Sequence, residues 1–317
     1  MEKPRLIIHP GMPKTGTTAI QKFFFHNRAI FAKHRLIYPD DVLAKEEPSH
    51  WPFFKSIVDR DFARWDNAFN QALQRSLTLL FSSEAICSHL MDMRDNNFDL
   101  QALSDRFDVR IGLVIRDNRA FTKSLYKQCI ANAPYTKSRS TAVNHYGTKL
   151  LFDEFVKSKW VEFLQSEEQV TTAFKQIFSE KIDLEIVRYN PANLIEQFSK
   201  QILGMRIKDV SQVRPNLSLP DFGTEALRQS NLHSVGSGLV LRTILRFAYP
   251  NTHNFWSFSL SQLTALDIQQ YQSFRRKLEF IDNPPLLFSE EDMHDFLHKI
   301  DIEFEKIQTL LPFAKKK

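Results

Sequence analysis

Two glycines five residues apart frame a short polar segment near the start of the chain. Residues 11–18 read GMPKTGTT and include one lysine and three threonines. Backbone N–H groups in such a loop, with the partial positive charge of a helix N-terminus, bind phosphate groups. In the GxxxxGK[ST] loop of nucleoside triphosphatases, a lysine directly follows the second glycine and contacts the β- and γ-phosphates. Thr17 holds that position here and the lysine is Lys14. The segment therefore predicts a phosphate site that does not hydrolyse a triphosphate with Mg²⁺; a turn that only caps a helix is the alternative.

The elements around this segment fit a phosphate site. Residues 6–8 are a short apolar run bounded by Pro4 and Pro10, which predicts a buried parallel strand. From residue 17 to about residue 33, apolar residues recur at spacings of three and four, which predicts a helix. The polar segment is therefore expected between the carboxyl end of a strand and the start of a helix.

The same alternation of strand and helix continues along the chain. Further strands are predicted at 77–82, 109–115 and 184–188, and helices at 118–131, 148–178, 222–249, 260–279 and 289–311. Pro191 is expected in the first turn of another helix. We predict an α/β fold with a P-loop-like central parallel β-sheet flanked by helices, and a mostly helical C-terminal part. One domain over residues 1–317 is expected, with a helical extension at about 221–317.

Composition limits the function classes. The chain has 317 residues, of which 43% are hydrophobic and 25% charged, as in ordinary globular proteins. Its two cysteines, Cys87 and Cys129, cannot build a disulfide framework and lack zinc-site spacing. No apolar stretch reaches the roughly 18–20 residues of a spanning helix, and the N-terminus is unlike a signal peptide, so a cytoplasmic protein without a transmembrane segment is expected. The net charge of +5 favours an anionic ligand and is weak support for nucleic acid, which we do not expect as a partner.

Residues 9–21, HPGMPKTGTTAIQ, resemble the 5′-phosphosulfate-binding loop of sulfotransferases, particularly of the bacterial, carbohydrate-type branch. These enzymes use 3′-phosphoadenosine 5′-phosphosulfate (PAPS) as co-substrate and need no metal. The resemblance implies that the loop binds the 5′-phosphosulfate through five residues: Lys14, Thr15, Gly16, Thr17 and Thr18. It also implies that Lys14 acts in catalysis, by stabilising the charge of the leaving phosphate.

The family also has a second site, for the 3′-phosphate, made of an arginine at a strand end and a serine on the next helix. Residues 114–126, VIRDNRAFTKSLY, carry Arg116 and Ser124 at the family spacing of eight residues. Arg116 precedes the predicted helix and Ser124 comes about two turns along it, so both can face one place. The resemblance therefore implies that these two residues bind the 3′-phosphate of PAPS.

Later segments resemble the family more weakly. The similarity continues through 183–190 and 214–220, so that it covers residues 5 to about 220. The resemblance therefore implies a nucleotide-binding core, for PAPS, at about 5–220. The C-terminal RKG motif of the cytosolic branch, which contacts the 3′-phosphate, is absent, and Arg214 is a candidate to replace it. The last hundred residues match no motif that we can name.

Transfer of a sulfuryl group to a hydroxyl requires a base for the acceptor proton. Glu84 follows the predicted strand 77–82 at the carboxyl edge of the sheet, where open α/β proteins bind ligands. Several carbohydrate sulfotransferases use a glutamate there, and cytosolic sulfotransferases use a histidine. We therefore predict Glu84 as the catalytic base, with a helix-capping or salt-bridged carboxylate as the alternative. Nearby histidines are the other candidates for the base: His89, His34 and His50.

The expected function is a PAPS-dependent sulfotransferase acting on a hydroxyl of a glycan or glycosylated small molecule. The polar, basic segment 131–147 is a candidate acceptor loop, in which Lys137 and Arg139 would meet an anionic acceptor and Tyr135 a sugar face. An exposed loop without function is the alternative. Two other function classes stay open: a P-loop kinase or NTPase with an unusual loop, which would turn over ATP with Mg²⁺, and a non-catalytic nucleotide-binding module. No metal is expected, because His294 and His298, four residues apart, have no third ligand at a suitable spacing.

Overall fold

The computed structural model describes residues 3–45, 47–132, 134, 140–206, 219–250, 260–280 and 288–311. The chain divides into two compact units, described one at a time below. The first consists of Met1–Phe121 and Lys159–Pro215, and the second of Thr122–Ser158 and Asn216–Lys317. The expected nucleotide-binding core of about 5–220 thus contains one stretch, Thr122–Ser158, that clusters with the C-terminal helices.

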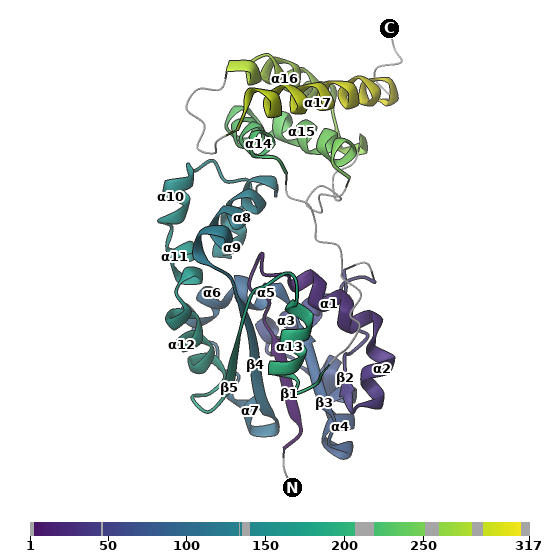
Figure 1. Ribbon diagram of the computed structural model, residues 1–317, viewed down its shortest axis with the longest axis vertical. Helices are drawn as coiled ribbons and strands as arrows, with labels where there is room; N and C mark the ends of the chain where they lie inside the picture. The colour runs from purple at the N-terminus through teal and green to yellow at the C-terminus, as the bar shows by residue number, and fades with distance from the viewer. Residues whose placement is uncertain are drawn as a thin grey trace. The chain divides into compact units, whose positions relative to one another are not determined.

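The first unit is built on a five-stranded parallel β-sheet (Figure 1). Its strands are β1 Arg5–His9, β2 Leu36–Ile37, β3 Thr78–Ser82, β4 Asp108–Ile115 and β5 Asp183–Arg188. Their order is β2-β3-β1-β4-β5, and every neighbouring pair is parallel. The four longer strands confirm the sequence prediction. The two-residue β2 was not predicted, because two residues carry no recognisable periodicity.

Helices cover both faces of this sheet. The first unit contains α1 Thr17–His26, α2 Arg28–Lys33, α3 Trp51–Asp59, α4 Asp66–Arg75, α5 Glu84–Ser88, α6 Leu90–Asp95, α7 Gln101–Arg106, α11 Lys159–Gln165, α12 Glu167–Phe178 and α13 Leu194–Ile202. On one face, Phe24 of α1 and Phe198 of α13 are fully buried in the main core. On the other face, Phe53 of α3 stacks on Phe81 of β3 with ring centroids 4.0 Å apart. The predicted α/β fold is therefore confirmed as a parallel sheet flanked by helices.

Four helix predictions were wrong in detail. The helix expected at 17–33 is two helices, α1 and α2, and residues 222–249 form two helices separated at Ser234, whose Oγ accepts a hydrogen bond from the backbone N of Ser237. Residues 148–178 form three helices, α10 Phe152–Val156, α11 and α12, and not one. The break before α12 lies at Ser166, whose Oγ accepts a hydrogen bond from the backbone N of Gln169 and so begins a new helix. Pro191 lies in a turn before α13 and not in the first turn of that helix.

The second unit is helical. It contains α9 Thr141–Asn144, α10, α14 Asp221–His233, α15 Val235–Ala248, α16 Ala265–Arg275 and α17 Glu290–Leu310, together with most of α8 Asn118–Ala131. The buried guanidinium of Arg242 donates hydrogen bonds to the carbonyls of Ile130, Ala131 and Asn132, at the end of α8. A cation at the carbonyls of a helix C-terminus stabilises the helix end. Although burial lowers the pKa of Arg242 to about 10, the group stays charged at neutral pH.

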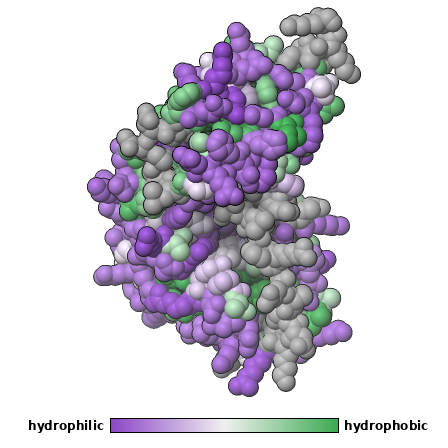
Figure 2. Space-filling view, turned by 45° about the horizontal axis from the view of Figure 1, so that its top comes forward, coloured by the Kyte–Doolittle hydropathy of each residue, from purple (hydrophilic) through white to green (hydrophobic). Residues whose placement is uncertain are grey.

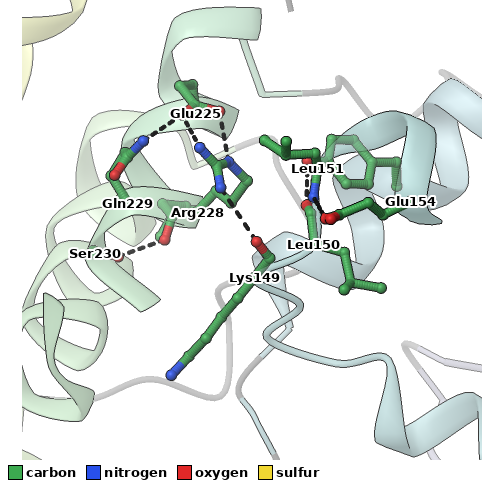
Figure 3. A network of polar contacts seen from close by, with 10 residues as sticks. Lys149, Leu150, Leu151, Glu154, Glu225, Arg228, Gln229 and Ser230 are labelled. Atoms are coloured by element: carbon green, nitrogen blue, oxygen red, sulfur yellow. Dashed lines mark hydrogen bonds and ion pairs between the residues drawn. The ribbon is translucent and has the colours of Figure 1, made fainter. Parts of the chain in front are cut away.

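Arg228 forms a buried ion pair with Glu225 within α14 and also bonds to the segment before α10 (Figure 3). Arg228 donates to both carboxylate oxygens of Glu225, over 2.9 and 2.7 Å, and to the carbonyl of Lys149 over 3.2 Å. Gln229 donates a further hydrogen bond to Glu225 over 2.8 Å. The side chains of Arg228 and Glu225 are only 6% and 1% exposed, so each charge depends on the other.

We expect the variant Arg228→Met to lose about 3–5 kcal/mol of unfolding free energy, because it leaves the buried Glu225 carboxylate without its cation. The double variant Glu225→Met/Arg228→Met should recover most of this loss, since neither charge then stays buried and unpaired. Urea unfolding followed by circular dichroism measures both. A single variant as stable as the native chain would contradict the assigned role of the pair.

Candidate functional site

The predicted phosphate loop joins β1 to α1 at the carboxyl edge of the sheet. Gly11, Lys14 and Gly16 have positive φ angles of 62°, 62° and 82°. Left-handed residues within a short loop are typical of backbone nests that bind anions. Helix α1 then begins, and the backbone N–H groups of Ala19 and Ile20 both donate hydrogen bonds to the carbonyl of Gly16, over 2.9 and 3.2 Å. A turned loop and a ten-residue helix thus follow the central strand.

Two threonine hydroxyls hold the loop together. Thr15 and Thr17 both donate to the carbonyl of Met12, over 2.7 and 3.3 Å, and both side chains are buried. The third, Thr18, is partly exposed on the first turn of α1. In the geometry described here, Thr15 and Thr17 therefore brace the loop, while Thr18 is the threonine closest to solvent.

The structure brings Glu84 against the phosphate loop. Glu84 is the first residue of α5 and is half-buried. A Cβ atom added to Gly11 would lie 2.9 Å from the Cα of Glu84 and 2.6 Å from the Cγ2 of Thr17, so only glycine fits between them. Two backbone bonds join the same segments: Ser83 N to His9 O over 3.0 Å, and Cys87 N to Pro10 O over 3.2 Å.

Arg116 reaches the other side of the loop. It directly follows β4, and its Nη1 donates to the carbonyl of Lys14 over 3.3 Å. Its guanidinium carbon also lies 5.1 Å from the centre of the Tyr189 ring, within cation–π range. Tyr189 was not selected from the sequence. It follows β5, and an added Cβ at Gly16 would lie 3.1 Å from it. The rule that selected Glu84, a polar residue just after a buried strand, would also have found Tyr189.

Other predicted site residues lie elsewhere. Ser124 is in α8, in the part of that helix that clusters with the second unit, whereas the loop and Arg116 belong to the first. Four candidates for acceptor or nucleotide contacts lie outside the described residues: Tyr135, Lys137, Arg139 and Arg214.

The histidine candidates for the base differ in their surroundings. His50 is fully buried: its Nδ1 accepts from the backbone N of Ser82 over 3.0 Å, and its Nε2 donates to the carbonyl of Pro39 over 2.9 Å. Both ring nitrogens are thus occupied, and burial lowers the pKa of His50 to about 4. His50 therefore holds the end of β3 and is not a loop residue over the site. His89 is partly buried and donates to the carbonyl of Ala85, whereas His34 is exposed after α2.

Among the residues that the structure describes, no group of three or more histidines, cysteines and acidic residues is placed to hold a metal ion. His294 and His298 both lie in α17.

No helix in the described ranges is long and apolar enough to cross a membrane. Figure 2 shows one face of the molecule, on which hydrophilic residues predominate among those coloured and apolar residues are scattered.

Acid should destabilise the first unit through two histidines. Burial lowers the pKa of His9 to about 3 and that of His50 to about 4, below the 6.5 of an unfolded chain. Below pH 6.5 the unfolded chain thus binds more protons than the folded chain. The contribution of the two neutral histidines to the free energy of unfolding is therefore complete above about pH 6.5 and is lost as the pH falls toward 4. Urea unfolding between pH 7.5 and 4.5 should show His9→Leu losing stability less steeply than the native chain, by up to about 1.4 kcal/mol per pH unit. The exposed His34→Leu is the matched control and should keep the native slope; an equally steep loss in His9→Leu would contradict the prediction.

Gly11→Ala should destabilise the protein more than Gly204→Ala. Both glycines have φ near +65°, so both substitutions meet the left-handed backbone penalty of about 1–2 kcal/mol. At Gly11 the new methyl group collides with Thr17 and the backbone of Glu84, whereas among the described residues, chain neighbours apart, no atom lies within 4 Å of a Cβ added to Gly204. The difference between the two unfolding free energies therefore measures how tightly the loop and Glu84 pack, and equal losses would contradict that packing.

Comparisons of this chain with models of protein families, with curated proteins and with solved structures gave no match. A functional assignment therefore rests on the residues of the loop and its neighbours.

Proposed function

We propose that this chain is a PAPS-dependent sulfotransferase that acts on a hydroxyl of a glycan or glycosylated small molecule. One observation carries the proposal: residues after three different strands meet at one loop. Lys14 belongs to the loop itself, Arg116 donates to the Lys14 carbonyl, and the backbone of Glu84 packs on Gly11. These are the positions at which the resemblance requires a leaving-group cation, a phosphate-binding arginine and a base.

The residues present suit a nucleotide with separate phosphate groups. At Gly11 and Gly16, the loop keeps space that a Cβ atom would fill. A guanidinium has five N–H donors, and the Lys14 carbonyl takes one of those of Arg116, so the group can also bind a phosphate. The loop would hold the 5′-phosphosulfate, and Arg116 the 3′-phosphate. When bound, PAPS supplies the sulfuryl group.

The chain would supply charge stabilisation and proton transfer. Lys14 and the loop amides would stabilise the negative charge that develops on the departing 5′-phosphate, because fixed donors stabilise such charge strongly. Glu84 would accept the proton of the acceptor hydroxyl on a carboxylate oxygen. Neither role needs a metal ion. Thr15 and Thr17, which brace the loop through the Met12 carbonyl, would keep the amides in place for the phosphate.

A P-loop kinase or NTPase is the second candidate, and the position of Glu84 favours it. An acidic residue after the strand beside the phosphate loop can also orient Mg²⁺, together with a hydroxyl such as that of Thr18 on the first helical turn. Against a kinase or NTPase, the chain has no lysine directly after Gly16, where such loops carry one. This candidate predicts metal-dependent ATP binding, whereas the sulfotransferase predicts metal-independent binding of adenosine 3′,5′-bisphosphate. A non-catalytic nucleotide-binding module would bind the bisphosphate without turnover.

Titration calorimetry with adenosine 3′,5′-bisphosphate and with Mg-ATP tests the proposal. We expect the bisphosphate to bind more tightly, with or without Mg²⁺. Arg116→Ala should weaken its binding by about 2–4 kcal/mol, because a charge-assisted contact is lost, and Lys14→Ala should weaken it as well. Arg119→Ala removes an exposed cation three residues away and should leave the affinity unchanged. Preference for Mg-ATP would overturn the assignment, and unchanged binding by Arg116→Ala would remove that residue from the site.

A further inference from the structure

A buried polar cluster lies beneath the candidate site and has no part in the function proposed above. At its centre is Ser82, the last residue of β3. The backbone N of Ser82 donates to His50 Nδ1, and its carbonyl accepts from the backbone N of His50 over 2.7 Å and from Gln21 Nε2 over 3.4 Å. Its Oγ lies 2.8 Å from Nδ1 of His9. Every polar atom of Ser82 therefore has a partner.

His50 takes the place of a missing strand. β2 pairs with β3 only at Thr78 and Leu79, so the outward N–H and C=O of Ser82 have no strand neighbour. The backbone and ring of His50 satisfy both groups, and this requires Nδ1 to be an acceptor. The end of β3 is thus fixed on its outer side by a side chain that is itself held by the Pro39 carbonyl.

His9 fixes the same strand end on its inner side. It is the last residue of β1 and lies opposite Ser82 in the strand register. The next residues of β1 lead into the phosphate loop, and the second residue after Ser82 is Glu84. The His9–Ser82 contact therefore joins the start of the loop to the segment that carries the proposed base.

Packing alone would not favour a histidine at position 9. His9 is fully buried, and its Nε2 has no hydrogen-bond partner in the part of the chain that the structure describes. An unsatisfied buried polar atom is costly, and the residues before it in β1, Leu6, Ile7 and Ile8, are apolar, so a leucine would suit position 9. The hydrogen bond between His9 Nδ1 and Ser82 Oγ therefore explains why position 9 is a histidine.

We propose that His9 is a positioning residue, which through Ser82 sets Glu84 at a fixed place beside the phosphate loop. This inference rests on the proposed function, since it needs Glu84 to lie near a bound 5′-phosphate. The carboxylate of Glu84 then repels the phosphate of adenosine 3′,5′-bisphosphate, and the repulsion falls with distance. The strength of that repulsion reports the position of Glu84 without any acceptor or turnover.

The test compares the effect of Glu84→Gln on bisphosphate affinity in two backgrounds, by calorimetry at low salt. In the native background we expect the substitution to tighten binding about 3- to 10-fold, because a like charge is removed. In the His9→Leu background the gain should fall below about twofold, and His9→Asn, whose amide can replace Nδ1, should restore it. Ser82→Ala removes the same contact and should behave as His9→Leu does, with no further change in the double variant. If His9→Leu does not fold, Ser82→Ala provides the same test.

The outcomes separate this inference from the function on which it rests. If the native chain does not bind the bisphosphate, the proposed function fails and the inference fails with it. If it binds, and Glu84→Gln has the same effect in both backgrounds, the positioning role is overturned while the nucleotide site stands. If Glu84→Gln has no effect in the native background, Glu84 is not beside the phosphate, and both its role as base and the role of His9 are overturned. His34→Leu, an exposed histidine of the same unit, is the control and should leave the native effect unchanged.

Discussion

The parallel pairing of β1 with β3 on one side and β4 on the other is the constraint on which the candidate site depends. Parallel strands end at the same edge of a sheet, so whatever follows each of them gathers there. The residues that meet at this edge are far apart in sequence: the loop at 11–18, Glu84, Arg116 and Tyr189. In an antiparallel sheet, residues after neighbouring strands would lie at opposite edges. The shared direction of the strands therefore brings these residues together, and their side chains then determine the chemistry proposed above.

The loop itself stores backbone strain. The chain has only eight glycines, and two of them take positive φ angles within six residues of each other, at Gly11 and Gly16. Between them, Lys14 adopts φ 62° although a side chain is disfavoured there. Such a residue persists only where the surroundings enforce it, and strain of this kind concentrates at functional sites. The loop thus keeps a lysine where glycine would relieve the backbone, which is consistent with a need for its charge.

Local signals predicted much of the fold and of the site. The buried strands, the helix over 118–131 and the polar loop can each be recognised within about ten residues. Glu84 was selected for its place after a strand, and Arg116 through the resemblance to sulfotransferases. What was missed depends on distant contacts. The division into two units brings Thr122–Ser158 together with the C-terminal helices, partly through Arg242, which bonds to carbonyls some 110 residues earlier. No pattern around Arg242 carries that information.

Both units contain buried polar atoms without a hydrogen-bond partner among the described residues, and two of these atoms lie beside the candidate site. In the second unit, the buried charges of Arg228, Glu225 and Arg242 have charged or carbonyl partners, whereas buried atoms of Gln128 and Tyr271 have no hydrogen-bond partner in the described ranges. In the first unit, fully buried polar atoms of His9 and Ser83 have no partner among the described residues. Both residues lie at the strand ends that carry the loop and Glu84. Because such atoms also occur elsewhere in the chain, as at Gln128 and Tyr271, being unpaired does not mark a functional residue by itself. His9 and Ser83 bear on function through their places at the strand ends, next to the loop and to Glu84.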